Sequence, residues 1–489
     1  MKLKYIFLIV IVFAIASIAN TSAQAQDAQV MDLVKNMQKQ MLDMQKMIDQ
    51  QAAKIKSLEG SAKNIQIAAP AAEPAAPMSD YEFATRLDSA LGGANKWLKD
   101  VKAGGDLRLR YEAFQHTSGN TAETDDRNRF RYRLRYGLEK KFSDEIKAGF
   151  SLASGEVRSG SSHDSATGLN GDPTSTNTTF DNLFNFKDIF VEKAFGSYAP
   201  NWAKVGPISG VELTGGKFTN PFEKGSSDLI WDRDVKPEGA YETVNFKLME
   251  TPNFKLNGYA TAGQYILDED SSGSDNEDAE MFGYQFGINP VIYTPMFDRP
   301  FDLLSAVSYY NYSDFDRQDN WKIGDTGGLS LARGNSTCTS KELCTGFKVI
   351  DIYNELSFYP FGDTPVRPYY DYAYNTADGQ STFDQNAWAL GVKIGKLVTK
   401  GDWETSFAWK NIGRDAIPGF NDSDFTGATT THTGTQGLVT KAGYMLRDNM
   451  SLNAAAFFLE NQNAGSVVAG STIRDEQQRR FQLDVSWKF

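Results

Sequence analysis

The chain has few of the residues that build metal centres and nucleophilic active sites. Its 489 residues include only two cysteines and three histidines, and His116, His163 and His432 lie far apart in predicted loops. A Ser-His-Asp hydrolase needs a histidine beside a serine on one wall, and no predicted strand offers that pairing. We therefore expect no catalytic residue, no metal and no cofactor, and we keep a membrane-embedded lipase only as a minor alternative.

The two cysteines, Cys338 and Cys344, stand close together in a polar stretch with no histidine nearby. Such an isolated pair makes a poor zinc site, because tetrahedral zinc usually needs four cysteine or histidine ligands. A small loop disulfide in an oxidising compartment is the favoured interpretation.

The sequence also lacks an excess of positive charge. Its 50 Lys and Arg against 62 Asp and Glu give a formal net charge of −12, which argues against a general nucleic-acid partner. After the N-terminal region, no segment reaches the roughly 18 uninterrupted apolar residues of a transmembrane helix. Aromatic residues nevertheless make up 12% of this polar chain, as expected for strands with one lipid-facing and one water-facing side.

The N-terminus is typical of a secretory signal peptide, predicted over residues 1–25. A basic start at Met1–Lys4 precedes an apolar run from Tyr5 to Ala19, and small residues at Ala23–Ala25 suit cleavage before Gln26. A transmembrane anchor is the alternative, but the apolar run is short for a stable span.

Residues 26–67 predict a periplasmic α-helical coiled coil. Apolar residues recur every seven positions in two interleaved series, without Gly or Pro before Gly60, and Gln51 is a polar member of the seam. The alternative is one amphipathic helix packed on a globular core. The first series contains Val30, Met37, Met44 and Leu58, and the second Val34, Met41, Ile48 and Ile55.

Residues 68–102 separate this helix from the rest of the chain. Three prolines among alanines at 68–77 predict a semi-rigid extended spacer, and residues 79–100 fit a short helix or plug.

From residue 103 to 489 the apolar period changes to two. In the segment 127–136, arginines at odd positions alternate with Phe130, Tyr132, Leu134 and Tyr136, so one face is apolar and the other charged. The last nine residues alternate in the same way and end in Phe489. We expect an all-β transmembrane barrel of about 16 antiparallel strands, preceded by the α-helical coiled coil.

The predicted connections alternate between long and short, as an up-and-down barrel requires. A large soluble all-β sandwich or propeller is the alternative; a propeller should repeat a blade motif, and none occurs. The predicted long loops are 115–127, 154–180, 220–238, 268–279, 313–346, 375–386, 412–436 and 460–478, and the short turns are 142–145, 250–253, 360–365, 399–402 and 447–449.

Several short motifs, taken in their order along the chain, resemble the bacterial "putative porin" family over roughly residues 100–489. The resemblance implies an outer-membrane pore, an assembly signal in the closing strand and no agreed substrate. Because porins are commonly trimers, we expect three coiled-coil strands. The motifs are Gly105–Glu112, Arg127–Arg135, Asp172–Asn177, Lys187 with Asp188, Gly215–Phe222, Leu229–Asp234 and Pro237–Gly239.

Six arginines have the water-facing parity of two adjacent strands, and near the bilayer midplane each would cost roughly 2–4 kcal/mol if it faced lipid. Across the barrel, Asp351, Glu355 and Asp371 share the inward parity, so a transverse field is one hypothesis; arginines that brace the wall are the other. Inward Tyr353 and Tyr369 hint at a specific channel. The six arginines are Arg108, Arg110, Arg129, Arg131, Arg133 and Arg135.

The third long loop, 220–238, is the candidate constriction, and an external loop is the alternative. Its candidate residues are Asp228, Trp231, Asp232, Arg233 and Asp234. Another loop, around 268–280, is acidic. A solvated loop is the favoured interpretation, and a Ca²⁺-binding loop is the alternative.

These features predict an outer-membrane porin for passive diffusion of small hydrophilic solutes and ions. A solute-specific anion or sugar channel, or a tether between outer membrane and cell wall, is the alternative. Expected partners are outer-membrane lipid, lipopolysaccharide and two further copies of the chain, with peptidoglycan as a partner of the tether.

Overall fold

The computed structural model describes residues 100–118, 124–156, 171–268, 278–295, 299–315, 333–336, 343–379, 384–427, 432–462, 467–468, 471–472 and 475–489. The predicted signal peptide, coiled coil and all but the last three residues of the spacer lie outside these ranges. No helix among the described residues is long and apolar enough to cross a membrane.

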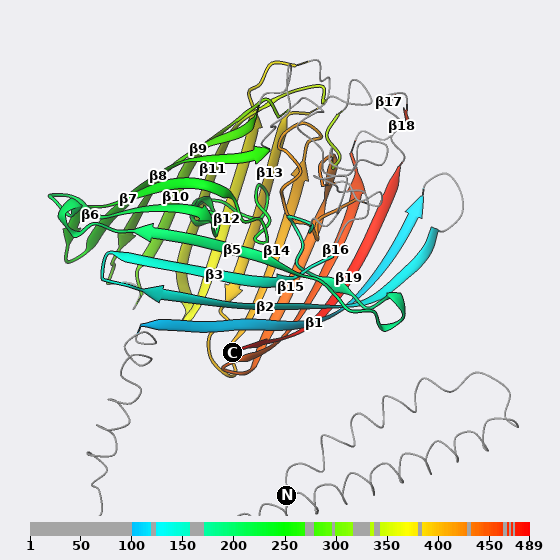
Figure 1. Ribbon diagram of the computed structural model, residues 1–489, viewed down its shortest axis with the longest axis horizontal. Coiled ribbons are helices and arrows are strands. Elements are labelled where there is room, and N and C mark those ends of the chain that lie inside the picture. The colour runs from blue at the N-terminus through cyan, green and yellow to red at the C-terminus, as the bar shows by residue number, and fades with distance from the viewer. Residues whose placement is uncertain are drawn as a thin grey trace, which may run out of the picture. The chain divides into compact units, whose positions relative to one another are not determined.

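The described chain forms a closed antiparallel barrel, which confirms the predicted class of the main domain. Sixteen long strands pair in chain order, and β1 closes the ring by pairing with β19 (Figure 1). The strands are β1 (Val101–Ser118), β2 (Thr124–Lys141), β3 (Ile146–Ser154), β5 (Ile189–Tyr198), β6 (Ile208–Lys217), β7 (Glu238–Thr251), β8 (Phe254–Asp268), β9 (Ala279–Ile292), β10 (Phe301–Ser313), β11 (Phe347–Phe361), β12 (Thr364–Asn375), β13 (Asn386–Gly395), β14 (Trp403–Ile412), β15 (Thr435–Arg447), β16 (Met450–Asn461) and β19 (Glu476–Lys488).

Three two-residue strands were not predicted, because pairs this short leave no period in the sequence. Strand β4 (Thr178–Thr179) pairs with β2, while β17 (Val467–Val468) and β18 (Ser471–Thr472) pair only with each other.

The strands form because their side chains suit two different environments. On β2, Phe130 and Tyr136 are exposed on the outer face, whereas Arg131 between them is buried inside the barrel. The predicted face assignment is therefore confirmed for this strand. A lipid-facing aromatic side and a polar inner side are what a membrane barrel requires.

The connections follow the predicted alternation. Each of the eight predicted long loops coincides with a connection at one end of the barrel, and each of the five predicted short turns lies at the other. Two further short-side connections, 199–207 and 293–300, were missed; the first contains the 3-10 helix η2 (Asn201–Ala203).

The two ends of the barrel chain meet at its seam. The Gly105 N–H donates to the Phe489 carbonyl at 2.8 Å, and the Phe489 N–H donates back at 3.1 Å. The Phe489 ring stacks on Tyr136 with centroids 6.5 Å apart. A Cβ at Gly105 would lie 2.1 Å from the Arg135 carbonyl oxygen, so only glycine allows this approach.

We predict that Phe489→Ala lowers the stability of the barrel by about 1 kcal/mol, since it removes one stacked aromatic pair at the seam, and slows folding into vesicles. Urea unfolding in lipid vesicles measures both. Phe361→Ala is the matched control, because this exposed ring has no ring contact among the described residues. Equal behaviour of the two variants would contradict a closing role for Phe489.

Candidate pore and its inner loops

The connection between β6 and β7, residues 218–237, lies inside the barrel; we call it the crossing loop. It begins with the 3-10 helix η3 (Pro221–Gly225), whose N-terminus is capped because the Asn220 side chain accepts from the Phe222 N–H at 3.0 Å. Phe222 and Leu229 are fully buried. The loop thus buries apolar side chains inside the barrel.

One side of the crossing loop is pressed against β8, β9 and β10. The Gln285 amide donates to the carbonyls of Phe222 and Gly225, at 3.0 and 3.2 Å. A Cβ at Gly225 would lie 2.3 Å from the Tyr259 hydroxyl and 2.5 Å from the Ala306 methyl. No side chain fits between this part of the loop and the wall.

Two of the three residues of the predicted acidic wall are buried rather than facing water, and one of them holds the loop. Asp371 accepts a hydrogen bond from the Ser227 N–H at 2.8 Å, and Asp351 accepts one from the Ser308 hydroxyl at 3.4 Å. Both carboxylates have the predicted inward parity but are fully buried. Glu355 alone of the three remains partly exposed, where it pairs with Lys393 at 3.2 Å.

At the far wall the loop meets a buried lysine. The Lys410 ammonium on β14 is 1% exposed and lies 2.8 Å from Asp228 of the crossing loop and 3.2 Å from Asp422. Lys441 on β15 pairs with the same two carboxylates at 3.4 and 3.8 Å. Burial alone raises the pKa of Asp228, but Lys410 and Lys441 outweigh it and hold that pKa well below its usual value.

A second inner loop, the β14–β15 connection at residues 413–434, closes over the first. Phe420 stacks on Trp231 with ring centroids 6.3 Å apart, and its carbonyl accepts from the Asp232 N–H at 2.7 Å. The Asp232 carboxylate accepts from the Ser423 N–H at 2.7 Å. The sequence predicted a long loop here but not its inward path, although two phenylalanines within its acidic stretch are a signal that it packs on another part of the chain.

Each of the six arginines singled out in the sequence has a polar or charged partner. Arg110 forms two hydrogen bonds of 2.8 Å to Asp484 and an ion pair of 2.9 Å to Asp424 of the second inner loop. Arg135 pairs with Asp234 and with Glu192, and Arg133 pairs with Asp106.

Glu112 is the centre of the remaining pairs. This fully buried carboxylate contacts Arg129, Arg131 and also Arg480, a basic residue of the closing strand that was not among the predicted six. Arg108 donates to the Asn177 side chain at 2.6 Å. The geometry therefore corresponds to the bracing hypothesis, since guanidinium charges alternate with carboxylates instead of standing free in water.

Two loop carboxyls inside the barrel have pKa values that are shifted in opposite directions. Burial raises the pKa of Asp424, but Arg110 and Arg480 outweigh it and hold that pKa well below its ordinary value. For Asp232, burial and then the neighbouring Asp234 and Asp422 raise the pKa well above its ordinary value.

Beneath the crossing loop lies a polar chamber of about 530 Å³. Lys224 and Lys247 face it, and neither pairs with a carboxylate among the described residues; the Lys224 ammonium lies 3.9 Å from the centroid of the Tyr259 ring. The other polar lining residues are Ser209, Asn245, Asn257, Asn289, Asp302, Glu355 and Ser357.

Comparison with protein families matches residues 120–372, a little over half of the chain, to the family described as "Putative porin". The chain belongs to this family. Its members are channels of the outer membrane and are typically not enzymes. No curated protein matches the chain.

Solved structures similar to this porin are also outer-membrane proteins. Pseudomonas putida OprB is 11% identical, with a TM-score of 0.43, over 81% of this chain and 97% of that one. Salmonella typhi OmpF in complex with daunomycin is 10% identical, with a TM-score of 0.41, over 80% and 97%. An anion-selective porin from Comamonas acidovorans is 12% identical, with a TM-score of 0.40, over 80% and 99%.

The remaining candidate residues differ in what the structure says of them. Arg233 of the crossing loop is exposed, and Tyr353 and Tyr369 are buried with their rings 6.3 Å apart. Cys344 carries no free thiol, but Cys338 lies outside the described residues, so the pairing of the two stays a prediction.

We predict that Lys410→Met destabilises the barrel by about 3–5 kcal/mol, because it leaves the buried Asp422 and the partly buried Asp228 without their main counter-charge. Lys441→Met is the matched control: this lysine pairs with the same carboxylates but is 44% exposed, so its loss costs about 1 kcal/mol or less. Denaturant unfolding in vesicles measures the difference. Equal losses in the two variants would show that the Lys410 pair is not the anchor of the loop.

Acidification provides a separate test of the inner loops. The lowered pKa values of Asp228 and Asp424 mean that their stabilising ion pairs are complete above the unfolded value near 4, and are lost only as the pH falls further through the folded values. The raised pKa of Asp232 has the opposite sign, since protonation relieves an unfavourable buried charge.

We therefore expect the barrel to become more stable, not less, between pH 7.5 and pH 4.5, and Asp232→Asn to reduce that gain; burial also raises the pKa of Glu223 in the same loop, so part of the gain remains. The thermal transition of the folded band in gel electrophoresis reports it. A fall in stability over this interval would contradict the assignment.

Proposed function

We propose that this porin admits small hydrophilic solutes and ions by passive diffusion across the outer membrane, with the crossing loop as its constriction. The observation that carries the proposal is the path of residues 218–237, which are bonded to the wall at β9 and β12 and again at β14 and β15. A barrel of about sixteen strands encloses a water-filled space. A segment fixed at both sides of that space limits the solutes that pass.

The arginine-lined wall enters this proposal in a modified role. Because Arg110, Arg131 and Arg480 are almost fully buried and paired with carboxylates, their charge is largely cancelled within the wall. They fix the shape of the passage by holding the inner loops. We infer that residual charge selectivity comes from side chains that still face the chamber.

A solute-specific channel is the second candidate, and the chamber beneath the crossing loop favours it. Amide and hydroxyl groups of Asn245, Asn257 and Ser357 offer hydrogen bonds, while Lys224 and Lys247 offer two positive charges. Asp302 and Glu355 also line the chamber, but Glu355 pairs with Lys393, so the lining keeps an excess of positive charge and suits small anionic or hydroxylated solutes better than cations.

The outer membrane, with its lipid and lipopolysaccharide, is the proposed location, and a homotrimer is the proposed assembly. The coiled coil at 26–67, its periplasmic position, and a tether from it to peptidoglycan rest on the sequence alone. Co-sedimentation with peptidoglycan, with and without residues 26–77, tests the tether.

We predict that deletion of residues 226–234 raises single-channel conductance at least twofold, because it removes the part of the crossing loop that reaches the far wall. Planar-bilayer recording measures the step size. Deletion of residues 269–277, a segment of the same length between β8 and β9, is the control and should leave conductance unchanged. If both deletions leave the step size unchanged, the crossing loop is not the constriction.

We also predict that Lys224→Gln with Lys247→Gln shifts the reversal potential in a potassium chloride gradient toward cations. Removing two positive charges from the chamber lowers the local anion concentration. Lys255→Gln is the control, because this lysine pairs with Glu250 outside the chamber. An unchanged potential would mean that these lysines do not control selectivity, and complete absence of current from folded protein would refute the porin proposal.

A further inference from the structure

An apolar projection stands on the outer wall between β4 and β5, in residues 180–189; we call it the knob. Leu183, Phe184 and Phe186 are 93%, 102% and 105% exposed, so these side chains touch almost nothing in their own chain. Leu183 and Phe184 both adopt a left-handed backbone, with φ of 51° and 67°, which turns the chain sharply at the tip. Water exposure of three large apolar side chains is unfavourable, so this surface requires a cover.

The base of the knob is fixed to the wall. The Phe180 N–H donates to the Phe130 carbonyl on β2 at 2.9 Å, and the Phe180 ring lies 5.9 Å from that of the outward-facing Tyr132. At its other end the knob continues into β5 beside β3. The exposed side chains therefore stand on the outer side of the barrel, over β2 to β5.

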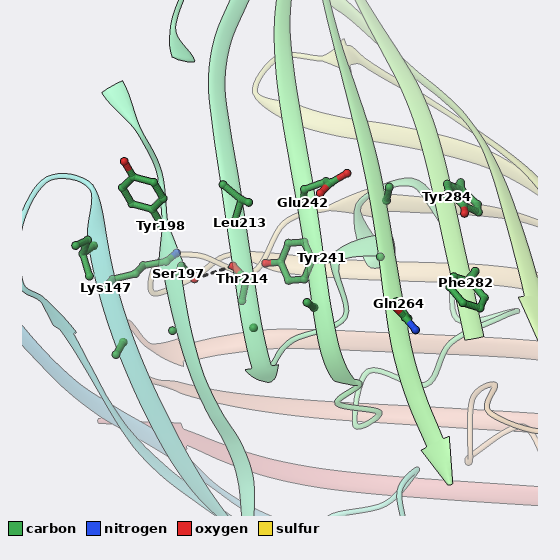
Figure 2. A pocket seen from close by; sticks show the side chains of 17 residues that line it. Lys147, Ser197, Tyr198, Leu213, Thr214, Tyr241, Glu242, Gln264, Phe282 and Tyr284 are labelled. Carbon is green, nitrogen blue, oxygen red and sulfur yellow. Dashed lines mark hydrogen bonds between the residues drawn. The ribbon is translucent and has the colours of Figure 1, made fainter. Parts of the chain in front are cut away.

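A groove of about 800 Å³ runs across the wall over β3 and β5 to β9 (Figure 2). Most of the residues that line it have the outward parity. Its floor consists of paired small residues on four neighbouring strands, since Ala148 pairs with Gly196, Gly196 with Gly215, and Gly215 with Ala240. Tyr198 and Tyr284 form part of its border.

Glu242 lies in the same groove and distinguishes it from an ordinary lipid-facing surface. In Figure 2 its side chain stands beside Tyr241 on the neighbouring position of β7. Tyr241 packs inward against Phe218, which places Glu242 outward. Its carboxylate is exposed and has no cation partner among the described residues. A carboxylate on the membrane face is unfavourable against hydrocarbon but suits a protein partner with a positive charge.

We propose that the knob of one copy of this chain fills the groove of the next copy. Phe184 and Phe186 would lie on the floor of Ala and Gly residues, where the absence of large side chains leaves room for rings. Lys187 follows directly after Phe186 and supplies the positive charge that Glu242 lacks. Within its own copy the Lys187 ammonium donates to the carboxylate and the carbonyl of Asp181, which is itself exposed, and Glu242 of the next copy would share this ammonium.

The positions of knob and groove on the barrel determine the assembly. A contact between two different patches of the same chain is heterologous and closes into a ring only when the angle between them fits. Sixteen strands around one turn are about 22° apart, so the centre of the knob near β3 and the centre of the groove near β6 and β7 are separated by roughly 60°. Three touching cylinders need contacts about 60° apart, whereas four need about 90°.

This inference deepens the proposed trimer of the porin by assigning its contact residues, and it rests on that proposal. Lipid is the other conceivable cover for the knob. We favour a second copy because the groove and the unpaired Glu242 require an occupant as much as the knob does. Lipid would cover the rings but would leave the carboxylate uncompensated.

Cross-linking tests the contact directly. In full-length protein that also carries Cys338→Ser and Cys344→Ser, Phe186→Cys with Ala240→Cys should form intermolecular disulfides under mild oxidation and give covalent dimers and trimers, with no larger species. Trp202→Cys with Ala240→Cys is the matched control, because Trp202 is also an exposed aromatic residue but lies on the β5–β6 connection. Equal cross-linking of the two pairs, or of Phe186→Cys alone, would overturn the proposal.

A second variant separates the partner from the membrane. Phe184→Ser with Phe186→Ser should shift the native mass in detergent from trimer to monomer, while the conductance of each channel unit stays unchanged. A variant that stays trimeric but inserts poorly into vesicles would make the knob a lipid anchor and refute the inference. Loss of conductance in an intact trimer would instead count against the porin function, so the two failures are distinguishable.

Discussion

The interior of this barrel depends on one buried ammonium group. Lys410 is surrounded by carboxylates from two different loops, Asp228 of the crossing loop and Asp422 of the second inner loop. A buried charge is tolerated only when it is compensated, and here neither carboxylate belongs to the wall itself. The strand can therefore carry this lysine only if both loops fold inward. The charges of the wall and of the loops therefore require each other, and their pairing fixes the shape of the passage.

The same principle accounts for the opposite side of the barrel. Arg110 and Arg480 on neighbouring strands would repel each other if they faced water alone, but Asp424 and Glu112 lie between them. Apolar contacts then seal the loops to one another, as in the stack of Trp231 on Phe420. What remains open to solutes is the region where the loops do not reach, including the chamber beneath η3. Paired charges thus act as structural supports, and we propose that the chamber side chains discriminate between solutes.

The sequence was sufficient for the barrel because strand formation depends on short-range alternation. The arginines at 129 to 135 identified the strand, and Arg131 among them is buried in the structure. Loop positions followed from the same pattern. The partners of those arginines could not be predicted, because Asp424 lies some 300 residues from Arg110 in sequence and reaches it only after the second loop folds inward. For the same reason Asp351 and Asp371 were assigned to an open wall, although the crossing loop covers them.

The inner and outer faces of the barrel differ in whether their side chains find partners within the same chain. Inside, the arginines and Lys410 pair with carboxylates of the inner loops or of neighbouring strands. Outside, Phe184 and Phe186 on one side and Glu242 on the other have no such compensation within the described chain. A loop cannot serve both faces at once, and the long loops that fold inward leave the outer wall uncovered. A neighbouring copy is the remaining source of cover that carries both the apolar area and the charge, which is why we attribute the unsatisfied outer surface to assembly.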